Sequence, residues 1–124
     1  MAKSVAICVC IALIVGSASA LSAVYIKNTA EYMSSSLEDA VEEKDIEKLS
    51  AILKETEKYW ERRKETLMLL VSHRDVENVS LALLRAKERT SAGRRDDAEQ
   101  EIKTVIFLVE ELYEREILSL GNII

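Results

Sequence analysis

The segment 73–77, with the sequence HRDVE, carries residue types that could bind a metal ion. On a helix His73 and Glu77 would face the same way, because they lie four positions apart, and Asp75 is close by. Zinc in proteins takes three or four ligands of the His, Cys, Asp or Glu type, and these come from more than one element. His73 is the single histidine, and both cysteines lie among the first ten residues. We therefore expect no metal and no other cofactor, and interpret His73 as a residue at a helix junction.

Trp60, the single tryptophan, is a second candidate for a binding site. An indole can hold a ligand or a partner protein, or it can supply a large apolar area to a core. Trp60 falls on the apolar stripe of a predicted helix, which favours the core anchor, while the neighbouring Tyr59 is expected to face outward. A catalytic triad needs a nucleophile and an acid beside a histidine, and no such set is readable around His73. With no glycine-rich phosphate loop either, we expect that the protein is not an enzyme.

The elements that position these residues begin with an uncharged segment. Residues 4–26 carry no charge, whereas all 22 acidic residues lie beyond them. As a helix, this run extends about 34 Å, and the hydrocarbon core of a membrane is about 30 Å thick. We therefore predict that residues 1–27 form a transmembrane anchor or a signal peptide, which contacts membrane lipid through residues 4–26.

Two interpretations of this segment stay open. In the first it is an uncleaved single-pass anchor, which we favour because residues 21–26 become apolar again before Lys27. In the second, residues 5–15 are the hydrophobic part of a signal peptide, and the protein is secreted after cleavage following Ala20. Lys3 precedes the segment and acidic residues follow it, so the positive-inside rule places the remainder outside the cytoplasm in both cases.

Beyond residue 27 the composition predicts helices. The chain contains no proline, and Glu, Lys, Leu and Ala are abundant. Residues 28–45 are expected to form a stalk or a short helix, because three serines at 34–36 interrupt the apolar pattern. Either a short helix begins at Ser36, with Asp39 three positions later as in a capping box, or the serines form a solvated bend in one long helix that leaves the membrane. Asp45 is a good N-cap for a helix that runs to about residue 72. A further helix covers about 74–91, where Leu81 and Leu84 widen its apolar face.

The last predicted helix starts near Asp96 and is followed by Gly121, while Gly93 is placed to end the helix before it. The links between the three helices are short, and short links make neighbouring helices antiparallel. We therefore predict an all-α protein in which an N-terminal transmembrane or signal helix precedes an antiparallel three-helix bundle at 46–124, outside the cytoplasm. A bundle of about 80 residues has a small core, so we also expect a protein partner or a homo-oligomer.

The order of these features resembles a known family. An apolar amino-terminal segment, Trp60, the sequence at 73–77, an acid-rich amphipathic helix and the pair Asn122-Ile123 follow one another. In this the chain is similar to a bacterial family of short membrane-anchored proteins known as domain of unknown function four-three-six-three. The resemblance implies an anchor in the bacterial cytoplasmic membrane, a helical outer domain and no assigned activity.

Composition and charge leave two hypotheses for the function. The net charge of −5 disfavours nucleic acid as a partner, because phosphate contacts need a basic face. The first hypothesis is an interaction or scaffold module at the outer face of a bacterial membrane, which recognises another protein through a groove between helices. The alternative is an extracytoplasmic sensor of a small ligand or a metal that uses the region of His73.

Overall fold

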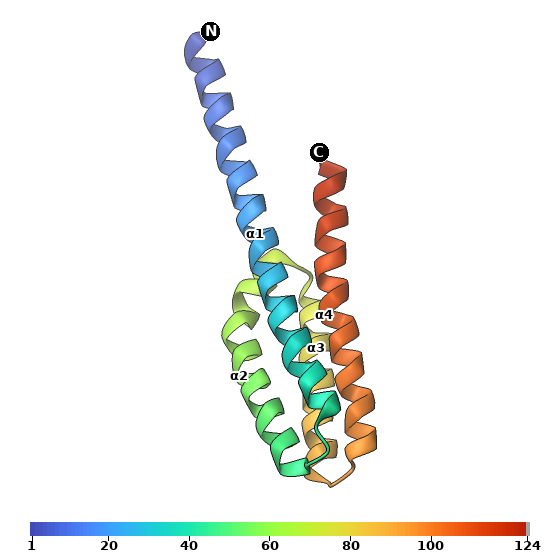
Figure 1. The fold of residues 1–124 in the computed structure, drawn as a ribbon. Coiled ribbons are helices and arrows are strands. Elements are labelled where there is room, and N and C mark those ends of the chain that lie inside the picture. Colours follow the sequence, from blue (N-terminus) through green and yellow to red (C-terminus); the bar gives the residue numbers. More distant parts are fainter. Residues whose placement is uncertain (124) are drawn as a thin grey trace.

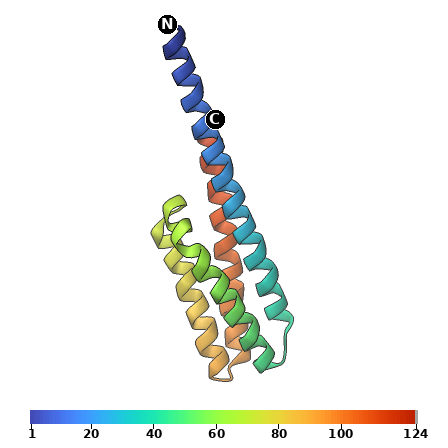
Figure 2. The same cartoon turned by 90° about the vertical axis from the view of Figure 1, so that its left-hand side faces the viewer.

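The protein is built from four helices that run alternately up and down (Figures 1 and 2). The computed structural model describes the backbone of residues 1–123 and the side chains of residues 1–118. The helices are α1 (Ala2–Glu42), α2 (Ile46–Leu70), α3 (His73–Ser91) and α4 (Arg95–Ile123), and residues 1–123 contain no strand. Helices α1 and α3 each pack against both α2 and α4. The prediction of an all-α protein is confirmed.

The bundle has four helices rather than the predicted three, because α1 continues past the uncharged segment. It runs without a break through the serines at 34–36 and ends at Glu42. The part that was expected to be a stalk or a short helix therefore supplies one wall of the core. Its buried residues recur at three- and four-residue steps, as one face of a helix requires. They are Ile26, Thr29, Ala30, Met33, Leu37 and Ala40.

The serine run does not interrupt α1, and one of its hydroxyls bonds across to α2. Ser36 Oγ lies 2.6 Å from Oγ1 of Thr56, which is fully buried. The Thr56 hydroxyl donates its own proton to the carbonyl of Ile52 at 2.8 Å, so Ser36 is the donor in the bond between the helices. A buried polar group is tolerated when it is hydrogen-bonded. Ser36 thus fastens α1 to α2 instead of beginning a new helix.

Two of the predicted helix ends are confirmed. The Asp45 carboxylate accepts hydrogen bonds from the backbone N–H groups of Glu47 and Lys48, at 2.9 and 3.4 Å, and so caps α2. Gly93 has a φ of +75°, the left-handed conformation that ends α3. The N–H of the next residue, Arg94, donates to the carbonyl of Arg89 at 2.9 Å, which completes a Schellman motif. Helix α4, by contrast, does not stop at Gly121 but extends to Ile123.

The core runs along the whole bundle, with Trp60 of α2 as its largest side chain. Helix α3 contributes a narrow buried stripe, and Leu81 and Leu84 are half exposed, at 49% and 47%. They therefore do not widen the buried face of α3 as expected, because α2 and α4 cover only one side of that helix. The larger core residues of α2, α3 and α4 are Leu49, Leu53, Leu67, Val76, Val79, Leu83, Ile102, Val105 and Val109.

Candidate functional site

The first half of α1 projects from the bundle and contacts no other helix along most of its length (Figure 1). This part of α1 is long and apolar enough to cross a membrane, and none of the residues in its most apolar stretch is buried. A helix that is apolar all round needs an apolar environment on every side. Its large exposed side chains are Val5, Ile7, Val9, Ile11, Leu13, Ile14, Val15, Leu21 and Val24.

A cluster of three tyrosines around Arg63 joins α1 to α2 where α1 leaves the bundle. The guanidinium carbon of Arg63 lies 4.7 Å from the centre of the Tyr25 ring and 4.9 Å from the centre of the Tyr59 ring. Tyr32 stacks on Tyr59, with the ring centroids 3.7 Å apart. The Tyr25 hydroxyl also donates to the backbone carbonyl of Arg63 at 3.4 Å. A cation held against two aromatic faces stabilises the contact between the helices.

The sequence interpretation missed this Arg63 cluster, and the prediction for Tyr59 was wrong. Tyr59 was expected to face outward, yet it is only 9% exposed because Tyr32 and Arg63 cover its ring. A signal was present in the spacing. Tyr25 and Tyr32 are seven positions apart, and Tyr59 and Arg63 are four apart, so each pair shares a helix face. That the two pairs meet follows only once α1 is known to continue into the bundle and to pack against α2.

A small cavity of about 230 Å³ lies between α1 and α4 near the same end of the bundle. It is smaller than most ligand pockets, which enclose about 300–1,000 Å³. Within it, Ser34 Oγ is buried and has no hydrogen-bond partner among the described residues. We assign the cavity no ligand, but it shows which residues of α1 and α4 lie at one level. Its lining residues are Lys27, Ala30, Glu31, Ser34, Glu110, Tyr113 and Glu114.

The residues of the segment 73–77 lie in different environments and do not form one site. His73 is exposed at the first position of α3, and Glu77 is exposed one turn further on. Asp75 instead faces α4, where its two carboxylate oxygens accept hydrogen bonds from Arg115 Nη1, each at 2.9 Å. Within residues 1–118 no group of three or more His, Cys, Asp or Glu side chains is arranged to hold a metal ion. The geometry thus uses Asp75 to join α3 to α4.

The ion pair with Asp75 also changes the pKa of Arg115. The hydrogen bond to Asp75, and after it the charge of Asp75, raise the pKa of Arg115, and Glu111 adds to the shift. Glu111 Oε2 lies 3.3 Å from Arg115 Nε, one turn earlier on α4. A raised pKa favours the charged form of arginine, so the stabilisation would be lost only as the pH rises through that value, far above neutrality.

Trp60 is completely buried between α2 and α3. Its indole Nε1–H donates a hydrogen bond of 2.8 Å to Ser80 Oγ on α3. The ring is covered by the bundle and presents no open face to a ligand. The indole therefore stabilises the core and positions α3 on α2, which agrees with the interpretation as a core anchor.

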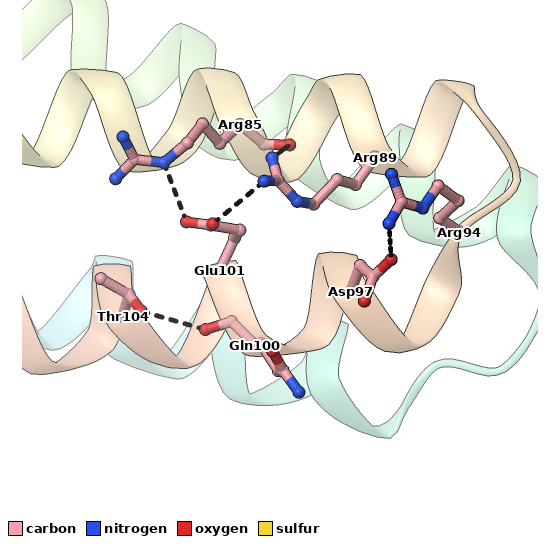
Figure 3. A network of polar contacts seen from close by, with 7 residues as sticks. All are labelled: Arg85, Arg89, Arg94, Asp97, Gln100, Glu101 and Thr104. Atoms are coloured by element: carbon pink, nitrogen blue, oxygen red, sulfur yellow. Dashed lines mark hydrogen bonds and ion pairs between the residues drawn. The ribbon is translucent and has the colours of Figure 1, made fainter.

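Near the turn between α3 and α4, at the other end of these helices from Asp75 and Arg115, charged side chains connect α3 to α4 (Figure 3). Glu101 of α4 accepts a hydrogen bond from Arg85 Nε at 3.1 Å and lies 3.6 Å from Arg89 Nη2. Arg94 forms an ion pair with Asp97 in the first turn of α4. These groups are mutually paired, which is typical of a structural network on a helix surface.

Another arginine at this end, Arg95, holds α1 in place. Arg95, the first residue of α4, donates from Nη2 to the carbonyl of Val41 at 2.7 Å and from Nε to the carbonyl of Glu43 at 2.9 Å. The last carbonyls of a helix lack partners within the helix. Arg95 therefore caps the carboxyl end of α1 from α4.

The protein is thus a four-helix bundle with one apolar helical projection. Its sequence matches a known family. The chain matches the family described as Domain of unknown function (DUF4363) over residues 20–123. This match covers most of the chain, so the protein belongs to that family, and the resemblance inferred from Trp60 and the segment 73–77 is confirmed. The matched part includes all of α1 that packs in the bundle and leaves out most of the exposed apolar part. Neither the curated proteins nor the solved structures give a match.

Proposed function

We propose that the protein is anchored in the bacterial cytoplasmic membrane by the first half of α1 and that its bundle is an interaction module at the outer face. The exposed apolar surface of residues 2–25 carries the first part of this proposal. Soluble proteins rarely expose apolar patches larger than a few hundred Å². A helix of this length extends about 36 Å, which suits a hydrocarbon core of about 30 Å.

The charges on either side of the segment support an outer location for the bundle. Lys3 precedes the apolar part of α1, and the bundle that follows contains all 22 acidic residues. Basic residues favour the cytoplasmic side of a membrane. We keep cleavage after Ala20 as the alternative, in which the same bundle is released as a secreted protein.

The location can be tested in bacterial cells that produce the full chain. We expect the intact chain in the membrane fraction after alkaline extraction, and digestion of its bundle when protease is added to spheroplasts. Mass spectrometry of the amino terminus distinguishes the anchor from cleavage after Ala20. The pair Ile11→Lys and Leu13→Lys should release the chain from the membrane, since each charge at a membrane centre costs about 2.5–3.5 kcal/mol. The matched pair Leu81→Lys and Leu84→Lys should leave it there, and full-length protein free in the cytosol would contradict the proposal.

The interaction role rests on apolar side chains of the bundle that face solvent. Leu81 and Leu84 of α3 are about half exposed, and Phe107 of α4 is 59% exposed. Leu81 and Leu84 lie three positions apart and so share a helix face. Large apolar side chains that face solvent on an otherwise polar bundle are typical of contact surfaces for other proteins. Asp75, which the sensor hypothesis needs, already holds Arg115, so we do not propose that function.

Two variants distinguish a specific interaction through this surface from non-specific hydrophobic association. Replacement of Leu81, Leu84 and Phe107 by serine should abolish a cross-linked complex in native membranes. Leu69→Ser, which removes an even more exposed leucine from the end of α2, should keep that complex. Co-expression of two differently tagged copies shows whether the partner is a second copy of this chain. If both variants retain the same complex, the surface on α3 and α4 is not the interaction site.

A further inference from the structure

Helix α4 extends past the link between α2 and α3, toward the side from which the first half of α1 projects (Figures 1 and 2). The two helices contact each other along the bundle and diverge beyond it, so that the end of α4 and the projecting part of α1 leave the bundle on the same side (Figure 1). The end of α4 therefore reaches beyond α2 and α3 toward the side on which α1 projects.

The charged residues of α1 and α4 end at the same level of the bundle. In α1, Lys27 is the charged residue that borders the uncharged segment 4–26, and in α4 the charged residue nearest the end is Glu116. The cavity between the helices places Lys27 with Tyr113 and Glu114. Because the helices are antiparallel, α4 beyond Glu116 leaves the bundle on the same side as the part of α1 that precedes Lys27. A shared boundary of charge on two neighbouring helices is expected where a membrane surface lies.

The residues of α4 past this boundary have the composition of a membrane contact. The run 117–124 has the sequence ILSLGNII and contains no charged side chain. Ile117 is 47% exposed and Leu118 is 68% exposed. These two side chains therefore lie uncovered at the level where the apolar part of α1 begins.

We propose that residues 117–123 insert into the interfacial region of the outer leaflet, on the side of the bundle from which α1 projects, as a second contact with the bilayer. This inference rests on the proposed membrane anchor. Seven helical residues extend about 10 Å, which matches the depth of about 5–10 Å at which apolar helix faces lie in the interface. The end of the helix then stays within reach of water and headgroups, which can bond its last carbonyls. The contact holds the bundle against the membrane at two points.

The depth of each site can be measured on the full chain with nitroxide labels. Cys8 and Cys10 are first replaced by alanine, and single cysteines are then placed at Leu118, at Phe107 and at Leu13. Each labelled chain is reconstituted in vesicles of phosphatidylcholine and phosphatidylglycerol. Phe107 is the matched control, since it is an exposed apolar residue of the same helix, eleven positions nearer the start of α4. Collisions with oxygen report contact with lipid, and collisions with a water-soluble nickel chelate report contact with water.

We expect oxygen to exceed the nickel chelate at positions 118 and 13, and the reverse at position 107, with unchanged helical circular dichroism for all three. If position 118 behaves like position 107 while position 13 is in lipid, the contact by α4 is overturned and the anchor stands. If position 13 also meets the nickel chelate, the anchor and the contact by α4 are both overturned.

Discussion

Single hydrogen bonds determine how well the polar atoms in this core are tolerated. The indole of Trp60 has Ser80 as its partner, and Ser36 bonds to Thr56 between α1 and α2. Because the Trp60 side chain is shielded from water, removal of its acceptor would leave an indole N–H unpaired. The cost of such a group, rather than the value of the bond itself, decides the effect of a substitution.

For Ser80→Ala we therefore expect a loss of about 1–3 kcal/mol in the free energy of unfolding. Urea unfolding of the chain in detergent, followed by the fluorescence of Trp60, measures this loss. The control is Ser50→Ala, which removes an exposed hydroxyl from α2 and should change the stability by less than about 0.5 kcal/mol. Equal effects of the two substitutions would show that the bond from Trp60 does not matter for stability.

Two adjacent arginines of α2 provide a test of the Arg63 cluster. Arg63 lies against the rings of Tyr25 and Tyr59, whereas Arg62 is exposed. We expect Arg63→Ala to lower the stability by about 0.5–2 kcal/mol, since a cation on partly desolvated aromatic rings contributes about that much. The same unfolding experiment applied to Arg62→Ala should show little change. A loss of similar size in both variants would mean that helix propensity and charge, not the tyrosines, cause it.

At the level of elements, the sequence predicted helix ends better than it predicted which helices pack together. Asp45 and Gly93 act through neighbours within a few residues, so their roles can be derived locally. The continuation of α1 depends on partners far away in the chain, which are the core residues that cover its buried face and Thr56, which bonds to Ser36. The spacing of Ile26, Ala30, Met33, Leu37 and Ala40 by four and three residues was nevertheless a readable signal of a buried helix face.

The site was less predictable than the fold for a related reason. Asp75 was grouped with His73 and Glu77 because they are close in sequence, but its partner Arg115 lies 40 residues away on α4. In the same way, Arg63 is a charged residue on a largely apolar stripe of α2, and only the position of α1 shows what its side chain contacts. Sequence patterns indicate which face of a helix is buried, and they do not indicate which residue of a neighbouring helix lies opposite.

The turn between α3 and α4 gives a prediction at this level. Gly93→Ala should destabilise the bundle by about 1 kcal/mol, because alanine is strained at a positive φ. No atom lies within 4 Å of the position that the new Cβ would occupy, so the backbone conformation alone carries the cost. Gly93→Asn is the matched control and should be milder, since asparagine tolerates the left-handed region. Thermal unfolding followed by circular dichroism compares the two, and equal losses would contradict this explanation.

A second element prediction concerns the end of α1. Arg95→Met removes two charge-assisted hydrogen bonds to the carbonyls of Val41 and Glu43. We expect faster hydrogen exchange of the amides in the last turn of α1 and a loss of about 1.5–3 kcal/mol in stability. Arg94→Met, which removes only an exposed pair with Asp97, should leave exchange in α1 unchanged. Faster exchange in both variants would argue against a cap by Arg95.

At the scale of the whole molecule, α1 belongs to the projection and to the core at once. The first residue that it buries is Ile26, so cleavage after Ala20 would leave the complete core in the remaining chain. A chain that starts at residue 46, the three-helix unit expected from the sequence, lacks Met33 and Leu37 as well as Ile26. Burial of such a side chain contributes about 1.5–3 kcal/mol. The total approaches the whole stability of a typical domain, about 5–15 kcal/mol.

We therefore expect a chain that starts at residue 21 to unfold cooperatively, at nearly the same temperature as the full chain. A chain that starts at residue 46 should show no cooperative transition. Circular dichroism during heating in the same detergent compares the two. A sharp transition in the shorter chain would restore the three-helix bundle as the folding unit.

If α1 anchors the protein as we propose, its unbroken course makes it a rigid helical connection between the lipid and the bundle. Each residue of a helix turns the chain by about 100° and advances it by about 1.5 Å. Deletion of a single residue between Gly16 and Val24 would swing Leu81, Leu84 and Phe107 through that angle about the membrane normal, while the interior of the bundle stayed as it was. The number of residues in this part of α1 thus fixes the direction, around the membrane normal, in which each face of the bundle points.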